Sequence, residues 1–592
     1  MNTIRYSIRR VARLEIQITA TFPSTTLDGR KIGAIHLPAW RPGRYELGNF
    51  AQYVFGMCER SGAVWEPMQK EDLHIWKLAS ETIKAIGDPR TVRYNFRCHA
   101  MDAGSTWADD DVLYVNPVNC MVYHPDLADF PCEVLLEDVP GEWKLACQLP
   151  QDADKTLRAS DMQELMDSPF IAAPQLTTQS FKASGVEFHV HSWGEIHFDY
   201  SAFVAAHEAF ASCQLAAFQG FPVDAYHFIY LFPPFPARHG VEHEASTVIS
   251  MGPAERMAEP AFYEETLAIG SHELVHTWNV KSLRPAEWMP YDFSKSSPSR
   301  LGYVAEGVTT YLGDLFLYEA GLIDLDGWLK RFGAYVKKHL WNPGRLTTSL
   351  ADSGFDTWLD GYARAGGGLP AVPHRVGNIY VEGAMLAFLC DVALNQANGT
   401  WLVDAMREMW MDAQAAPRAG RPKGLTEEAY WNKLASCSSN AGNSGNSGNG
   451  SKEKLAELRA NFCDGTPRDS WPSLVEAFAH QGITATLARN PNALHAAGAL
   501  TRSRGDQPAE VVSVWPESPA WDAGLVPGAR IHSVELSLGM DLVQVQFSHA
   551  GRSFDKALEA PKSIKELKSL KSSEELSGFS AGYFPQIELG KS

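Results

Sequence analysis

The sequence lacks the features that mark membrane, secreted and disulfide-rich proteins. No run of about 18 apolar residues occurs, so no membrane span is expected. The opening residues, MNTIRYSIRR, contain no apolar signal-peptide core. The nine cysteines are scattered without a Cys-x-x-Cys pair, which is typical of reduced thiols. We therefore expect a cytoplasmic protein with no membrane partner.

Positive charge is also scarce. The chain has 52 Lys and Arg against 70 Asp and Glu, a formal net charge of -18. A nucleic-acid partner would require a basic face, so we expect none. We interpret the acidity as simple solubility. With 592 residues, 45% of them hydrophobic, the chain is globular and too long for one core.

The sequence HELVH at residues 272–276 is an instance of H-E-x-x-H. On a helix, residues four apart share a face, so His272 and His276 can offer their imidazoles to one ion. An open zinc site needs three protein ligands, and neutral imidazole is a favoured one. Glu273 is the expected general base, which takes a proton from the water that zinc activates. The alternative is an ordinary amphipathic helix with two half-exposed histidines.

A third ligand is offered by Glu306, which lies in the apolar, helix-compatible run 301–312. A lone acid in such a run is costly to bury, and metal coordination would explain its place. The sequence thus predicts one Zn²⁺ per chain, held by His272, His276 and Glu306.

The stretches HELVHTWNVKSLRP and AEGVTTYLGDL resemble the glycyl aminopeptidase family. LPAWRPGRYELGNFAQYV, at residues 37–54, is similar to the N-terminal signature of that family. The resemblance implies a zinc aminopeptidase with a thermolysin-like catalytic core and an appended PDZ domain. It also implies peptide substrates with a free N-terminus and a preference for small first residues, Gly and Ala.

Residues 239–247, HGVEHEAST, resemble the GGxEHxxST segment of the family, in which the acid binds the substrate amine. The resemblance assigns Gly240 and Glu242 to substrate binding. His239 replaces the first glycine, and we expect its side chain to narrow the pocket or change the preference for the first residue. Without the resemblance, Glu242 would be interpreted as an exposed strand acid.

Tyr380 and Gly383 match a Tyr-x-Lys-Gly element of the family, whereas Ile379 and Glu382 depart from it. The resemblance implies that the Tyr380 hydroxyl stabilises the oxyanion that grows on the attacked carbonyl. The alternative is a tyrosine at a helix start that packs on the core.

Pattern and resemblance together predict a multi-domain α+β protein. Residues 1–165 form a β-rich, sandwich-like domain, since residues 13–22 alternate apolar and polar. Residues 166–491 form a thermolysin-like catalytic domain with a helical part and a flexible low-complexity insert at 438–451. Residues 492–592 are expected to be PDZ-like, because SPAWDAGLVPGARI resembles bacterial PDZ domains, with Ala529 in place of the usual Asp. PDZ domains capture peptides by strand addition, and the sequence leaves open whether this copy binds one.

The favoured function is a zinc-dependent aminopeptidase. One alternative is a zinc endopeptidase to which the PDZ-like domain delivers protein chains. Another is a non-catalytic peptide-binding protein, which gains weight from the departures at His239, Ile379, Glu382 and Ala529.

Overall fold

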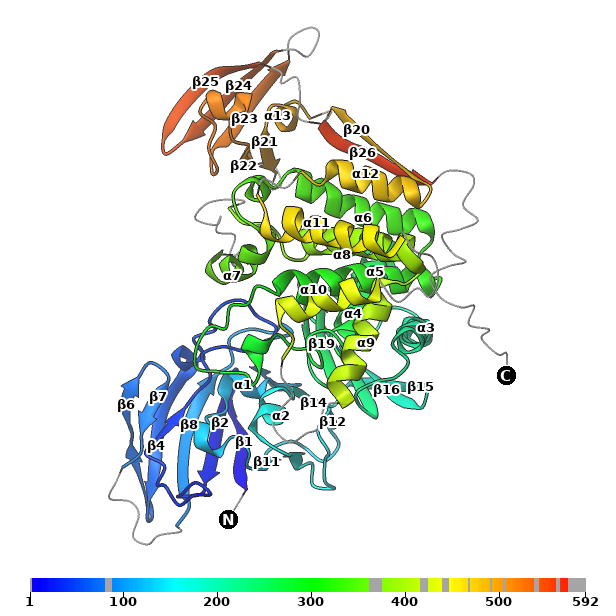
Figure 1. The fold of residues 1–592 in the computed structure, drawn as a ribbon. Helices are drawn as coiled ribbons and strands as arrows, with labels where there is room; N and C mark the ends of the chain where they lie inside the picture. Colours follow the sequence, from blue (N-terminus) through cyan, green and yellow to red (C-terminus); the bar gives the residue numbers. More distant parts are fainter. Residues whose placement is uncertain are drawn as a thin grey trace. The chain divides into compact units, whose positions relative to one another are not determined.

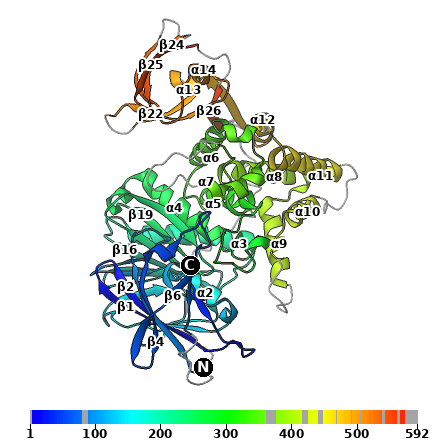
Figure 2. The ribbon, with the colours of Figure 1, turned by 90° about the vertical axis from the view of Figure 1, so that its left-hand side faces the viewer.

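The computed structural model describes residues 3–79, 88–360, 375–415, 424–438, 447–466, 469–489, 492–503, 507–536, 542–559 and 565–572. The chain divides into two compact units. The first contains Met1–Ser297 and Trp410–Gly424, and the second contains Pro298–Met409 and Leu425–Ser592. Both units mix helices and strands, as Figures 1 and 2 show, so the predicted α+β class is confirmed.

The N-terminal part is built from β-strands, as the sequence predicts. In the strand Glu15–Phe22 every second side chain is buried, which is the alternation expected of a half-buried strand. This strand lies in a seven-stranded sheet whose order is β13 (Leu157–Ala159), β11 (Cys132–Leu136), β1 (Ile4–Ala12), β2 (Glu15–Phe22), β8 (Arg90–Arg97), β4 (Val54–Ser61), β5 (Val64–Pro67).

Two smaller sheets and several short helices complete the N-terminal part. The four-stranded sheet has the order β12 (Lys144–Cys147), β14 (Phe170–Ala173), β10 (Leu113–Val115), β9 (Trp107–Ala108). The three-stranded sheet has the order β3 (Ala34–His36), β7 (Ile75–Lys77), β6 (Gln69–Asp72). The short helices are η1 (Phe50–Tyr53), α1 (Pro117–Cys120), η3 (Pro125–Leu127) and α2 (Met162–Met166).

A five-stranded sheet with two long helices follows in the same unit. Its order is β15 (Leu176–Ala183), β16 (Val186–Gly194), β17 (Ala225–Phe232), β19 (Ser246–Gly252), β18 (Ala237–Glu242). β18 is antiparallel to β19 and forms one edge. Helix α3 (Tyr200–Phe218) begins where Asp199 accepts a hydrogen bond from the Ala202 amide, and α4 (Pro260–Val275) begins at a proline. The short helices η4 (Ala254–Ala258) and η5 (Ala286–Trp288) flank α4.

The face of this sheet away from α4 packs on the N-terminal part. One core cluster joins Tyr114 and Ile171 of the four-stranded sheet to Ile229, Val248 and Val241 of the five-stranded sheet. Burial of such side chains contributes about 1.5–3 kcal/mol each. This shared core holds the edge strand β18 against the N-terminal part of the same unit.

The second unit is mainly helical at first. Helix α8 is central, because it contacts η6, α5, α6, α11 and α12. The elements are η6 (Tyr303–Val308), α5 (Thr309–Glu319), α6 (Leu325–Leu340), η7 (Pro343–Leu346), α7 (Leu350–Asp360), α8 (Val381–Asn398), α9 (Leu402–Ala415), α10 (Glu427–Cys437), α11 (Ser447–Leu458), η8 (Arg459–Asp464) and α12 (Trp471–His480). Of the low-complexity insert predicted at 438–451, residues 439–446 lie outside the described residues, and α11 begins at Ser447.

The C-terminal part of this unit is a β-structure. Its five-stranded sheet has the order β21 (Ala499–Arg502), β22 (Ala509–Val514), β23 (Arg530–Leu536), β24 (Leu542–His549), β25 (Arg552–Glu559). The short helices α13 (Ala493–Ala496) and α14 (Pro519–Asp522) accompany it. β20 (Ile483–Arg489) pairs with β26 (Lys565–Ser572) outside this sheet. Among all the described residues, none of the helices is both long and apolar enough to cross a membrane.

Candidate metal centre

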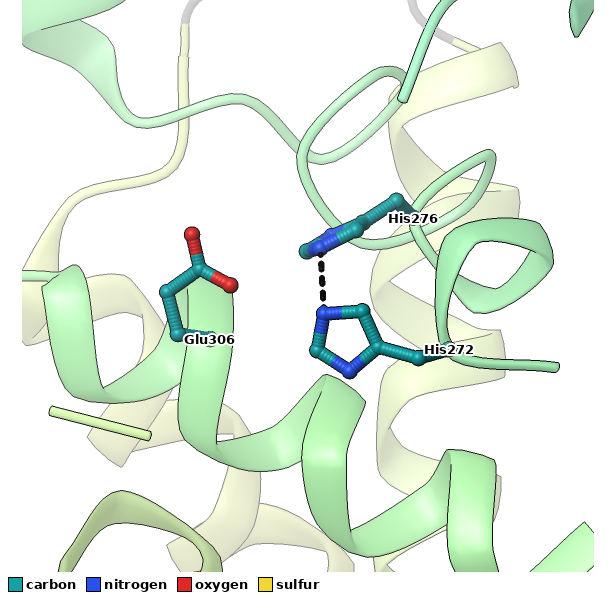
Figure 3. A group of neighbouring side chains, drawn as sticks. All are labelled: His272, His276 and Glu306. Carbon is teal, nitrogen blue, oxygen red and sulfur yellow. Dashed lines mark hydrogen bonds between the residues drawn. The ribbon is translucent and has the colours of Figure 1, made fainter. Parts of the chain in front are cut away.

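The two motif histidines lie at the C-terminal end of α4. His272 is in the last turn and His276 caps the helix, so their Nε2 atoms are 3.0 Å apart (Figure 3). The Nδ1 atom of His276 donates a hydrogen bond to the carbonyl oxygen of Asn279 at 3.1 Å. That bond fixes the tautomer and leaves the Nε2 lone pair of His276 available to an ion.

Glu306 lies in η6, a π-helical turn, and is only 5% exposed. Single π-helical turns are rare and are frequently found at functional sites. Glu306 belongs to the second unit and the two histidines to the first, and Figure 3 draws the three side chains. Two imidazoles and one carboxylate are a donor set of the kind that catalytic zinc takes.

Two glycines explain how the turn that carries Glu306 packs on α8. A Cβ atom on Gly307 would collide with the backbone of Gly383. A Cβ atom on Gly383 would in turn lie 2.7 Å from the Tyr303 carbonyl oxygen. Both positions therefore exclude any side chain, and η6 and α8 touch backbone to backbone. The Gly383 of the expected Tyr-x-Lys-Gly element thus has a packing role.

The two departures in that element are also accommodated inside the second unit. Glu382 is 3% exposed, and its Oε1 atom accepts hydrogen bonds from Asn342 Nδ2 and the Asn378 amide, both at 3.3 Å. Ile379 is buried as well. Tyr380 directly precedes α8 and is half-buried. Its assignment as the donor to the oxyanion stays a prediction.

Glu242 lies on the face of β18 that points to α4. Residues 240 and 242 share this face by strand alternation, and a Cβ atom on Gly240 would collide with Glu273 Oε1. Ligand atoms of Glu242, Glu273 and His276 fall within 4.8 Å of one another. Glu242 is 7% exposed, and the described part of the chain gives its carboxylate no hydrogen bond or ion pair. A buried carboxylate of this kind is costly unless a cation binds to it.

His239 points the other way. Its ring contacts Arg41 and Asp102, and its neighbour Val241 packs in the core shared with Met101 and Ala103. The expectation that this side chain directly narrows the pocket is therefore wrong. The physical reason is the period of two along a strand, which places residue 239 on the face opposite to Glu242.

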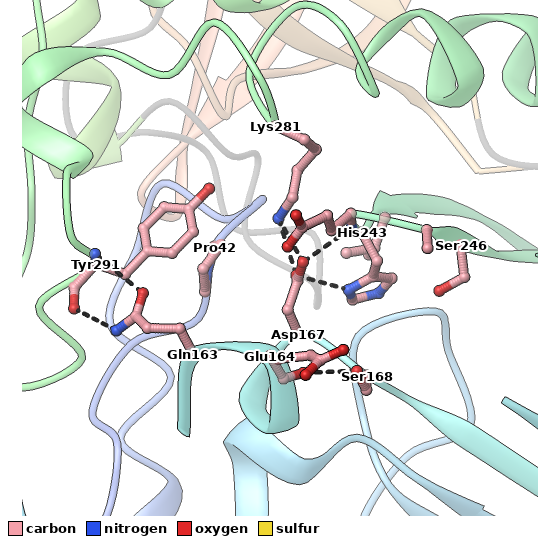
Figure 4. A network of polar contacts seen from close by, with 12 residues as sticks. Pro42, Gln163, Glu164, Asp167, Ser168, His243, Ser246, Lys281 and Tyr291 are labelled. Atoms are coloured by element: carbon pink, nitrogen blue, oxygen red, sulfur yellow. Dashed lines mark hydrogen bonds and ion pairs between the residues drawn. The ribbon is translucent and has the colours of Figure 1, made fainter. Parts of the chain in front are cut away.

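A buried charge network supports both the edge strand and the loop after α4. Asp167 accepts hydrogen bonds from Lys281 Nζ at 2.9 Å, from His243 Nδ1 at 3.0 Å and from the Glu244 amide at 2.9 Å (Figure 4). Burial raises the pKa of Asp167, but Lys281 and His243 lower it more, and it lies well below its ordinary value. Burial lowers the pKa of Lys281, and Asp167 reverses that effect, so this pKa lies above its ordinary value. Both groups are therefore charged in the folded protein.

Two members of this network are linked through the backbone to residues of the candidate site. Lys281 donates its amide hydrogen to the carbonyl oxygen of His276 at 3.0 Å, and His243 directly follows Glu242. Sequence reasoning assigned no role to Asp167 or Lys281. The apolar neighbours Val280 and Leu283 indicate that Lys281 is buried and needs a counter-charge. No local pattern identifies Asp167, 114 residues earlier, as that counter-charge.

Three solved structures are similar to this chain, and the first of them shows the fold. The crystal structure of an aminopeptidase N family protein from Idiomarina loihiensis matches 98% of this chain and 100% of its own, with 21% identity and a TM-score of 0.82. An M1 zinc metallopeptidase from Deinococcus radiodurans matches 77% of this chain and 92% of its own, with 11% identity and a TM-score of 0.42. A variant of that enzyme with a bound Tyr-Ser-Ala substrate matches the same shares, with 12% identity and a TM-score of 0.43.

Two family models match stretches of the sequence. A search of curated proteins finds no match. The model of the M61 glycyl aminopeptidase matches residues 265–386, which include both motif histidines, Glu306 and Tyr380. The model of the peptidase M61 N-terminal domain matches residues 4–174. The resemblance to the glycyl aminopeptidase family is therefore confirmed over these two stretches of the chain.

Proposed function

We propose that this protein is a zinc-dependent aminopeptidase that removes small first residues, Gly and Ala, from peptides. The observation that carries the proposal is the buried carboxylate of Glu242, grouped with Glu273 and His276 and without a hydrogen bond or ion pair among the described residues. The α-ammonium group of a peptide is a cation that pairs with such a carboxylate. A substrate held at that end places its first peptide bond beside Glu273.

In this proposal His272, His276 and Glu306 hold one zinc ion. When bound, zinc lowers the pKa of a water molecule to about 7 and polarises the substrate carbonyl. Glu273 removes the proton from the attacking water and returns it to the leaving amine. The Tyr380 hydroxyl donates a hydrogen bond to the oxyanion. Glu242 orients the substrate by its α-ammonium group and makes the cut exopeptidic.

The C-terminal five-stranded sheet is proposed to be the PDZ-like domain. Ala529, which replaces the usual Asp, is fully buried in the core of this sheet with Val511 and Leu525. Gly524 and Gly528 have φ values of 80° and 84°, so the segment that resembles PDZ domains turns at glycines. The departure at residue 529 thus serves packing, and peptide capture by this sheet is left to experiment.

Two measurements test the catalytic proposal. A peptide that begins with Gly should be cleaved, and its N-acetylated copy should not, because acetylation removes the charge that Glu242 binds. Equal cleavage of both would overturn the exopeptidase proposal in favour of the endopeptidase. The Glu273→Gln variant should retain zinc and lose hydrolysis, whereas full activity in that variant would exclude Glu273 as the base.

A further inference from the structure

The turn Arg41–Pro42–Gly43 in the N-terminal part contacts both faces of the edge strand β18. Gly43 has a φ of +73°, and a Cβ atom built on it would lie 2.6 Å from Glu242 Oε2. A side chain there would strain the backbone, because of the positive φ, and would displace the Glu242 carboxylate. On the other face of β18, Arg41 Nη2 lies 3.5 Å from His239 Nε2. The turn is thus fixed to the strand that carries the carboxylate.

Three further contacts hold this turn from the N-terminal side. His239 Nδ1 lies 3.5 Å from Asp102 Oδ1, and the same oxygen accepts a hydrogen bond from the Gly104 amide at 2.8 Å. The backbone of Gly104 lies directly against the Arg41 guanidinium, where a Cβ atom would collide. Arg41 is only 1% exposed. Asp102, His239 and Arg41 therefore form a continuous brace from the N-terminal part to the turn.

We infer that the turn at Gly43 is the end wall of the amine subsite, and that Arg41, His239 and Asp102 are positioning residues that hold it there. The inference rests on the proposed function, in which Glu242 binds the substrate amine. The turn covers one oxygen of Glu242 and fixes the orientation of the carboxylate. The subsite then accepts an unsubstituted primary α-ammonium group and excludes substrates whose peptide chain continues beyond that nitrogen. The histidine that replaces a glycine of the family segment thus acts through Arg41, on the face of β18 away from the substrate.

Binding of two small ligands tests this wall directly. Glycyl-leucine carries a free amine, and acetyl-leucine is the same molecule with hydrogen in place of that amine. Their dissociation constants are measured by calorimetry on the full chain, loaded with zinc and carrying Glu273→Gln so that no hydrolysis occurs. The ratio of the two constants reports the amine subsite alone, because every other contact is shared.

Gly43→Ala should cut the preference for glycyl-leucine by about 10- to 100-fold, the effect of losing one hydrogen bond to a charged group. Its matched control is Gly29→Ala, because Gly29 also has a positive φ of +82° but has nothing within 4 Å of an added Cβ. His239→Ala should reduce the preference through the brace. Its control is His189→Ala, a partly exposed histidine of the same sheet with a Glu187 oxygen 3.9 Å away.

The outcomes separate this inference from the proposed function. Loss of preference in Gly43→Ala and His239→Ala, with both controls unchanged, supports the wall. If the Glu273→Gln protein prefers glycyl-leucine and both variants keep that preference, the wall is refuted and the aminopeptidase proposal stands. If the Glu273→Gln protein shows no preference, amine recognition by Glu242 fails and the wall fails with it. Should Gly43→Ala not fold, as seen by thermal unfolding beside Gly29→Ala, His239→Ala decides alone.

Discussion

Asp167 is expected to be a sensitive polar position of the first unit, because three groups donate hydrogen bonds to its buried carboxylate. Its side chain is 9% exposed, and that of its partner Lys281 is 1% exposed. Asp167→Ala leaves the Lys281 ammonium buried without its counter-charge. Removing one partner of a buried ion pair costs about 3–5 kcal/mol. We expect a loss of that size in the free energy of unfolding, measured by urea denaturation at pH 7.

The matched control is Asp152→Ala, which removes an aspartate paired with Arg158 where both side chains are nearly half exposed. An exposed pair contributes about 0–1 kcal/mol, so this variant should be almost as stable as the wild type. The double variant Asp167→Ala with Lys281→Met removes both buried charges and should recover most of the stability. Equal losses in Asp167→Ala and Asp152→Ala would refute the argument.

The same ion pair makes the stability of the folded protein depend on pH. The pKa of Asp167 is lower in the folded protein than its ordinary value of 3.8, so its stabilisation is present above that pH. The stabilisation is lost as the pH falls towards the folded pKa. The difference in stability between wild type and Asp167→Ala should therefore shrink below about pH 4. An unchanged difference would show that the charge of Asp167 is not the cause.

Three further predictions concern the proposed base, the metal and the buried His191. Gly240→Ala should lower kcat about 100-fold and retain zinc, because the added Cβ displaces Glu273. The control Gly33→Ala has open space around its Cβ and should leave kcat unchanged. Equal kcat values in the two variants would contradict this prediction. Chelation should abolish hydrolysis and lower Tm, and one equivalent of Zn²⁺ should restore both, whereas activity that persists without metal would exclude the zinc site. Burial and the neighbouring His227 lower the pKa of His191 from 6.5 to about 3. On acidification this histidine is therefore protonated in the unfolded chain before it is protonated in the folded protein. The free energy of unfolding should fall by about 2 kcal/mol between pH 6.5 and 4.5. His191→Gln should lose less over this interval in urea unfolding, and an equal loss would show that another group titrates.

Local periodicity explains the parts of the site that could be predicted from sequence. The spacing of His272 and His276 fixes their shared helix face, and their Nε2 atoms lie 3.0 Å apart. The alternation along β2 is also local and was predicted correctly. The period of two along β18 could have shown that His239 faces away from Glu242, but the loss of a family glycine was interpreted as a change in the pocket. The roles of Glu382 and Gly383 depend on Asn342 and Gly307, which no local pattern connects to them.

The sequence by itself predicted the donor set of the candidate site, two imidazoles and an acid on one helix, and showed a resemblance that can be followed residue by residue. Helix and strand periods are set by backbone geometry, so residues a few positions apart are placed by local rules. Only the tertiary structure decided that Gly43 contacts Glu242 and that Asp167 neutralises Lys281 across 114 residues. Such contacts form because burial brings distant segments together, and a buried charge is tolerated only where the fold also brings its partner.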